Sequence, residues 1–100
     1  NEPPKTDTST DNFFVKSGKE LIRLSYGQIY YIEGLGDYVT LVCRDSNIVT
    51  YRRMKELEDV LPHNFQRVHL SYIVNTDKIL KISDNQILIN EKKIPLSDKY

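Results

Sequence analysis

One histidine stands inside an apolar, strand-like run, RVHLSYIVN at residues 67–75, and the polar residues around it are the first candidates for chemistry. Arg67 and Ser71 lie two residues before and after His69, and Asn75 ends the run. A neutral imidazole both donates and accepts a hydrogen bond, so His69 could serve as a base, a metal ligand or a polar contact. The choice depends on what the rest of the chain can bring to it.

Catalytic and metal-binding arrangements find little support in the sequence. A nucleophilic scheme can be written with Ser71, His69 and Asp77. Alternation along a strand, however, makes His69 and Ser71 mere neighbours on one face, without the sharp turn and oxyanion-binding loop that such chemistry needs. Two histidines, His63 and His69, with the single Cys43 match no spacing of zinc ligands. We therefore expect no enzymatic activity, no metal and no cofactor.

The elements that must position these residues are mostly β-strands joined by short turns. Period-two patterns and turn signals predict hairpins between 13–16 and 20–25, between 38–44 and 48–52, between 79–83 and 86–90, and between 86–90 and 93–97, with a bend at 34–37 between the segments 29–33 and 38–44. The exception is MKELEDVL, where Met54, Leu57, Val60 and Leu61 recur at helical spacing. Pro62 ends this helix, because the residue before a proline is pushed out of the helical conformation. The sequence thus predicts a mostly β domain with one short helix.

Length and composition favour one compact domain behind a linker. A chain of 100 residues with 39% apolar composition can bury a single core. Residues 1–12, NEPPKTDTSTDN, contain two prolines and no apolar side chain beyond them, so we expect a linker here, a folded domain over 13–100, and a further domain before the linker. No run approaches the roughly 20 apolar residues of a membrane span. The lone Cys43 fits a reducing compartment, and we expect a cytoplasmic protein without membrane contact.

The net charge gives no support to a nucleic-acid partner. The chain has 14 basic and 14 acidic residues, and removing Glu2, Asp7, Asp11 and Lys5 of the linker leaves 13 basic and 11 acidic residues, a net of +2. This balance is too small to identify a partner. Any binding to DNA must therefore depend on a local face of the domain.

Five segments in this order resemble the LytTR family of bacterial DNA-binding domains: FFVKSGKELIRL, IYYIEGLGDYV, MKELEDVLP, FQRVHLSYIVNTDKI and KIPLSDKY. The resemblance covers residues 13–100, and its most specific parts are YIEGLGDYV, RVHLSYIVN and IPLSDKY. It implies an elongated arrangement of small, mostly antiparallel sheets. It also implies the C-terminal output domain of a two-component response regulator that controls transcription, with a receiver domain joined through residues 1–12. Members of this family bind double-stranded DNA by loops that enter successive major grooves.

The resemblance also implies which residues face the DNA. The three segments are Asp37, Tyr38 and Thr40, with Gly36 and Val39; Arg67, His69, Leu70 and Ser71; and Asp98 and Lys99, with Ser97. At His69 a half-buried core position remains the alternative to a place at the DNA, where it would serve a phosphate, a base edge or the loop backbone. For Tyr72, Ile73 and Val74 the core interpretation is favoured.

Three features depart from the family pattern. Leu70 stands where many members have a basic or amide residue; it would pack against a thymine methyl group or, alternatively, into the sheet. Asp98 stands where a basic residue is frequent, and three roles are open for it: capping a following helix, positioning Lys99, or accepting from cytosine N4. The sequence also stops at Tyr100, where family members usually continue into a helix.

Two functions from different classes follow from these observations. The first is sequence-specific binding of double-stranded DNA, which is compatible with a homodimer on the DNA. The alternative is a β-rich protein-interaction module without DNA binding, which the near-neutral charge and Asp98 favour. Lys16, Arg67 and Lys99 on one surface with the three segments would favour the first function. Dominance of acidic residues there would favour the second.

Overall fold

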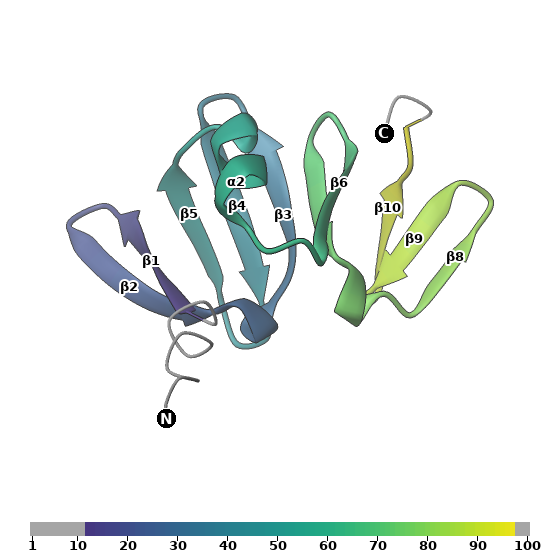
Figure 1. Ribbon diagram of the computed structural model, residues 1–100, viewed down its shortest axis with the longest axis horizontal. Helices are drawn as coiled ribbons and strands as arrows, with labels where there is room; N and C mark the ends of the chain where they lie inside the picture. Colours follow the sequence, from purple (N-terminus) through teal and green to yellow (C-terminus); the bar gives the residue numbers. More distant parts are fainter. Residues whose placement is uncertain (1–11, 98–100) are drawn as a thin grey trace.

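The computed structural model describes residues 12–97, which form three antiparallel sheets arranged along the long axis of a molecule of 44 × 32 × 25 Å (Figure 1). The first sheet pairs β1 (Asn12–Ser17) with β2 (Glu20–Ser25). The central sheet has the order β5-β4-β3-β7-β6, from β3 (Ile29–Leu35), β4 (Tyr38–Cys43), β5 (Asn47–Tyr51), β6 (Phe65–His69) and β7 (Tyr72–Asn75). The third sheet joins β8 (Lys81–Ser83), β9 (Gln86–Ile89) and β10 (Lys92–Pro95). The mostly β fold predicted from the sequence is confirmed.

The predicted helix is confirmed as α2 (Met54–Val60), the single α-helix among the described residues beside 3-10 turns at Tyr26–Gln28 and Thr76–Lys78. Its apolar residue Leu57 is buried against the central sheet. The helix lies close to β3, because a Cβ atom added at Gly34 would stand 3.0 Å from Cγ and Sδ of Met54. Glycine at this position therefore permits the close approach of α2 to the end of β3.

Each face of the central sheet is buried under a different partner. Adjacent residues of a strand point to opposite faces, so Ile73 and Val74 belong to two cores. The first core adds side chains of β1, β2 and α2, namely Val15, Leu24 and Leu57. The second adds Ile87, Ile89 and Ile94 from the third sheet. A continuous apolar run such as Tyr72–Val74 is what a strand covered on both faces requires.

Short turns close the predicted hairpins. Asp84, Asn85, Asn90 and Glu91 all have positive φ, as two-residue type I′ turns demand. The last hairpin turns at residues 90–91, one position earlier than the sequence pattern indicated. β3 continues to Leu35 rather than ending at Glu33. Gly36 follows in the turn between β3 and β4, with φ +65°.

The run RVHLSYIVN is two strands rather than one, which corrects the sequence-based interpretation. β6 ends at His69, residues 70–71 form a turn, and β7 begins at Tyr72. The ladder between the two strands shifts register between Arg67 and His69, which marks a β-bulge at Val68. His69 and Ser71 are therefore not same-face neighbours on a strand, and the nucleophilic scheme loses its premise.

Candidate functional site

Two backbone hydrogen bonds bring segments distant in the sequence to one edge of the molecule. The amide of Gly34 donates to the carbonyl of Ser71 at 2.8 Å, and the amide of Ser97 donates to the carbonyl of Val68 at 2.9 Å. The β3–β4 turn, the β6–β7 turn and the end of β10 consequently lie along the upper edge in Figure 1. We call residues 36–38, 69–71 and 97 the loop edge.

The β6–β7 turn presents one apolar side chain and fixes one histidine. Leu70 is 65% exposed, which excludes the interpretation that it packs into the sheet. His69 is half-buried; its Nδ1 accepts a hydrogen bond from the amide of Ser71 at 3.1 Å, and its ring meets Tyr72 edge to face. An accepting Nδ1 assigns the proton of the neutral ring to Nε2, which is left as a donor. His69 thus orients the turn backbone, and its contact with DNA stays a prediction.

Arg67 lies beside this turn with its guanidinium turned to protein groups. Its Nη1 pairs with the carboxylate of Glu58 on α2, and its Nη2 donates to the carbonyl of Leu70 at 2.6 Å. The side chain of Arg67 is 13% exposed. Contact between Arg67 and DNA stays a prediction.

The β3–β4 turn contributes a second exposed group to the loop edge. Asp37 is exposed in the turn, and Tyr38 is 53% exposed, with its ring edge to face against Tyr51 at 5.2 Å. Thr40 is half-buried further along β4. Val39 is 1% exposed in the first core, so its expected place at the DNA is wrong: strand alternation turns this side chain inward.

The third expected segment is described only at its beginning. Ser97 is half-buried and joined to β6 through Val68. Asp98 and Lys99 lie outside the described residues, and their roles stay predictions.

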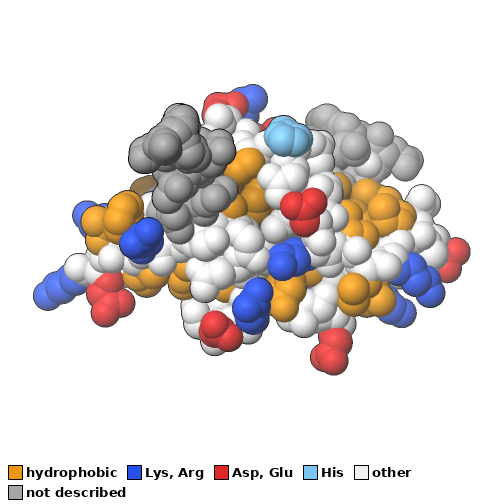
Figure 2. Space-filling model, turned by 60° about the horizontal axis from the view of Figure 1, so that its bottom comes forward, with side chains coloured by type: hydrophobic (Ala, Val, Ile, Leu, Met, Phe, Trp, Pro, Cys, Tyr) orange, Lys and Arg blue, Asp and Glu red, His pale blue; other side chains and the backbone are white. Residues whose placement is uncertain are grey.

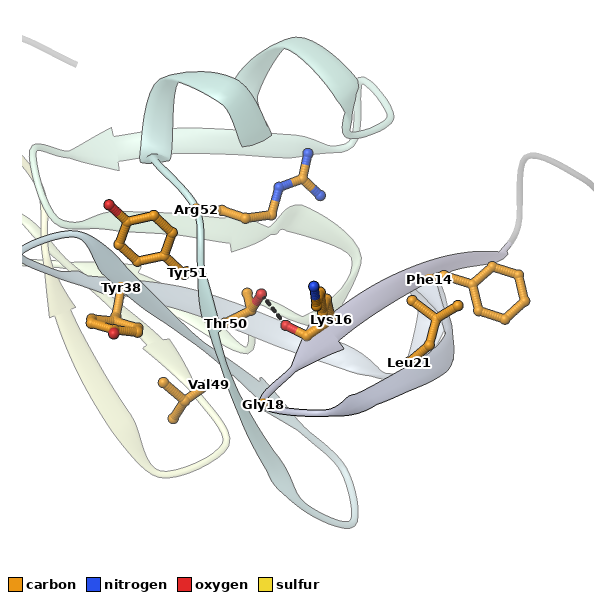
Figure 3. A pocket seen from close by; sticks show the side chains of 9 residues that line it. All are labelled: Phe14, Lys16, Gly18, Leu21, Tyr38, Val49, Thr50, Tyr51 and Arg52. Atoms are coloured by element: carbon orange, nitrogen blue, oxygen red, sulfur yellow. Dashed lines mark hydrogen bonds between the residues drawn. The ribbon is translucent and has the colours of Figure 1, made fainter.

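A groove of about 560 Å³, which no sequence pattern indicated, lies between the first sheet and β5 (Figure 3). Its walls carry exposed apolar side chains together with two cations: Phe14, Leu21, Tyr38, Val49, Tyr51, Lys16 and Arg52. The hydroxyl of Thr50 donates to the carbonyl of Lys16 at 2.5 Å and joins the two walls. Tyr38 belongs to both the groove and the loop edge, so the two surfaces are continuous.

The charges around these surfaces are mixed in sign. Of the three cations expected to mark a DNA-binding face, Arg67 is paired with Glu58, Lys16 lines the groove, and Lys99 is outside the described residues. Figure 2 brings the lower side of the molecule forward and turns the loop edge to the back; on that lower face, Lys and Arg side chains are interspersed with Asp and Glu. Neither Lys16 nor Arg67 therefore marks the loop edge as a basic surface.

Burial perturbs several hydroxyl and thiol groups near the sheet. Burial raises the pKa of Tyr72, and the charge of Glu33 raises it further together with the hydrogen bond that the hydroxyl donates to that carboxylate at 3.3 Å. Burial, with a smaller contribution from the charge of Asp45, also raises the pKa of the Cys43 thiol. Such a thiol is held in its unreactive, protonated form.

Within residues 12–97, no group of three or more His, Cys, Asp or Glu residues is arranged to hold a metal ion. Over the same residues, no helix has the length and apolar character to cross a membrane.

Comparison with known proteins agrees with the geometry. The family described as the LytTr DNA-binding domain matches residues 19–100. A similar solved structure is the LytTr DNA-binding domain of a protein described as a methyl-accepting/DNA response regulator from Bacillus cereus. It is 23% identical, with a TM-score of 0.75 over 90% of this chain and 89% of that chain, a likeness that shows the fold. No match was found among curated proteins. Because the family match spans most of the sequence, the chain belongs to the LytTR family of DNA-binding domains.

Proposed function

We propose that this domain binds specific sequences of double-stranded DNA by inserting its loop edge into the major groove, as the output domain of a bacterial two-component transcriptional regulator. The observation that carries the proposal is the pair of hydrogen bonds from Gly34 to Ser71 and from Ser97 to Val68, which aligns the three segments. The long axis of 44 Å also exceeds the roughly 34 Å that separate successive major grooves. The molecule as a whole is thus long enough to span two successive major grooves.

Base recognition is assigned to the exposed groups of the loop edge. Leu70 offers an apolar surface to a thymine methyl group, and the hydroxyl of Tyr38 offers a polar contact to a base edge or a phosphate. Asp37, Thr40 and Ser71 supply further polar groups, and Asp98 and Lys99 extend the contact beyond Ser97. His69 has a dual assignment, since it holds the turn through Nδ1 and offers Nε2–H as a donor.

The remaining parts of the proposal concern the full-length protein. Residues 1–12 link the domain to a preceding receiver domain, and the regulator acts in the cytoplasm without catalysis of its own. Binding to repeated half-sites as a homodimer suits an elongated domain that contacts DNA along one edge.

Selection of bound duplexes from a random pool, followed by affinity measurements over a salt series, tests this function. Each neutralised phosphate contributes about −0.9 to the slope of log affinity against log salt, so a few contacts give a slope of a few units. We expect modest affinity and a slope in that range, because residues 13–100 carry a net charge of only +2. No enriched sequence and a flat salt response would overturn the proposal.

The groove supports a second function, protein interaction without DNA binding. Phe14, Leu21, Val49 and Tyr51 expose apolar surface beside β5, as protein-binding sites commonly do. The same selection experiment separates the two functions. The interaction module would be supported by two results together. The domain would bind no duplex at low salt, and Leu21→Ser would abolish its binding to a protein partner in solution.

A further inference from the structure

The β6–β7 turn is braced from outside its own strands. Arg67 sits on β6 just before the turn, and its guanidinium joins the carboxylate of Glu58 on α2 to the carbonyl of Leu70 at the tip. A planar guanidinium suits this task because its donors diverge in a fixed fork. The side chain of Arg67 thereby links the helix to the tip of the turn.

The turn needs such a brace because its own ladder is interrupted. The register shifts between Arg67 and His69, so only one pair, His69 with Tyr72, stands between the bulge and the turn. The carbonyl of the bulge residue Val68 accepts a hydrogen bond from the amide of Ser97. The carbonyl of Leu70, at the exposed tip, is reached by Arg67. Arg67 therefore acts where strand pairing no longer fixes the backbone.

We infer that Arg67 is a positioning residue that, anchored by Glu58, presets the Leu70 turn for base recognition, and that it is not a phosphate contact. The inference rests on the proposed DNA-binding function. Binding a phosphate would require the guanidinium to leave Glu58 and Leu70, which would break an ion pair whose Arg67 side chain is only 13% exposed. A turn that is already ordered before binding lowers the entropic cost of binding. This cost would otherwise arise at the turn tip, where Leu70 contacts a base.

Glu58→Ala and its neighbour Asp59→Ala provide a matched comparison. Both substitutions remove one negative charge from the exposed face of α2, and only Glu58 anchors Arg67 among the contacts that the structure describes there. Released Arg67 leaves the turn less ordered, so Glu58→Ala should weaken binding to the selected duplex about fivefold relative to Asp59→Ala. The salt slope should be the same in both variants. A phosphate-contacting Arg67 gives the opposite result, because freeing it from Glu58 would tighten binding.

Arg67→Lys tests the fork itself, since it keeps the charge and loses the diverging donors. We expect Arg67→Lys to weaken duplex binding as much as Glu58→Ala does, with an unchanged salt slope. A further variant, Arg67→Ala, would overturn the inference if its salt slope were shallower by about one unit. Amide hydrogen exchange provides a readout that does not need DNA. The amide of Ser71, bonded to His69 Nδ1, should exchange faster in Glu58→Ala than in Asp59→Ala. If the wild type binds no duplex, the proposed function fails. The bracing role of Arg67 is refuted by a different result, an equal exchange rate of the Ser71 amide in Glu58→Ala and Asp59→Ala.

Discussion

The side-chain amide of Asn75 donates a hydrogen bond of 2.9 Å to the carbonyl oxygen of Ile29, and so joins the end of β7 to the start of β3 across 46 positions of sequence. The oxygen of the same amide accepts from the side chain of Asn64 and from the backbone of Asp77. Asn75 is 1% exposed. One buried side chain therefore forms hydrogen bonds with three segments: the start of β3, the residue before β6, and the 3-10 turn after β7.

Replacing Asn75 with alanine should cost about 2–3 kcal/mol of unfolding free energy, because the Ile29 carbonyl loses its buried donor. Urea denaturation of the domain measures the loss. Asn47→Ala, at an exposed position of β5, is the control and should change stability by less than about 0.5 kcal/mol. Equal losses in the two variants would contradict the role given to Asn75.

Glycine at Glu91 should stabilise the domain. Glu91 has φ +68° in the turn between β9 and β10, a conformation that costs an ordinary residue about 1–2 kcal/mol and glycine almost nothing. Because glycine also adds freedom to the unfolded chain, we expect a net gain of about 0.5–1 kcal/mol from Glu91→Gly in urea denaturation.

Gly18→Ala is the reverse experiment on the first hairpin. Gly18 has φ +63°, and a Cβ atom there would meet nothing within 4 Å, so strain alone would act. We expect a loss of about 1 kcal/mol. A loss on Glu91→Gly, or no loss on Gly18→Ala, would contradict the assignment of strain to these two turns.

Local signals in the sequence predicted most of the elements. Alternating apolar residues and pairs such as Asp84-Asn85 report on neighbouring residues only, and the hairpins that they predicted are present. The turn at Leu70-Ser71 was missed because Leu70 is not a typical turn former and Ser71 stands alone within an otherwise apolar, strand-like run. The backbone hydrogen bond from the Gly34 amide to the Ser71 carbonyl helps to hold this turn. Because it joins distant segments, no local sequence pattern predicts it.

The candidate site could be predicted only in part. The three DNA-facing segments were predicted from the family resemblance. Composition, charge and residue spacing by themselves did not identify them as DNA-facing. Exposure of Leu70, burial of Val39 and the pairing of Arg67 with Glu58 depend on how strands and α2 pack. The groove likewise depends on where the first sheet meets β5 through the Thr50–Lys16 hydrogen bond. Such contacts join residues far apart in sequence, so composition and spacing do not reveal them.

Stability should fall in alkaline solution through tyrosines that are buried or half-buried in the fold. Burial is the main cause that raises the pKa of Tyr26, Tyr31 and Tyr72 above the ordinary value of 10.0. The folded state therefore holds these protons more tightly than the unfolded state. Their contribution is fully present below pH 10 and is lost as the pH rises through the folded pKa values. Urea denaturation between pH 8 and pH 11 should show this decline.

Tyr72→Phe isolates one group in this decline. The variant cannot ionise at this position, so its unfolding free energy should fall less steeply above pH 10 than that of the wild type. Below pH 9 it should lose only the contribution of the hydrogen bond to Glu33. An alkaline slope equal to that of the wild type would show that Tyr72 has no part in the effect.

Leu70 should confer a preference for thymine at the base pair that it faces. Its side chain is exposed at the turn tip and cannot donate or accept a hydrogen bond, but it can pack against the 5-methyl group in the major groove. Replacing that thymine with uracil in the selected duplex removes only the methyl group. Wild type should lose about 1 kcal/mol of binding, roughly fivefold in affinity, on this change.

The comparison of Leu70→Ala with Leu80→Ala completes the test. Both leucines are strongly exposed, at 65% and 70%, and only Leu70 belongs to the loop edge. Leu70→Ala should bind the thymine and uracil duplexes almost equally, because the contact with the methyl group is already lost, while Leu80→Ala should discriminate as wild type does. Neither variant should lower the unfolding free energy by more than about 0.5 kcal/mol. Undiminished preference for thymine in Leu70→Ala would remove this side chain from base recognition.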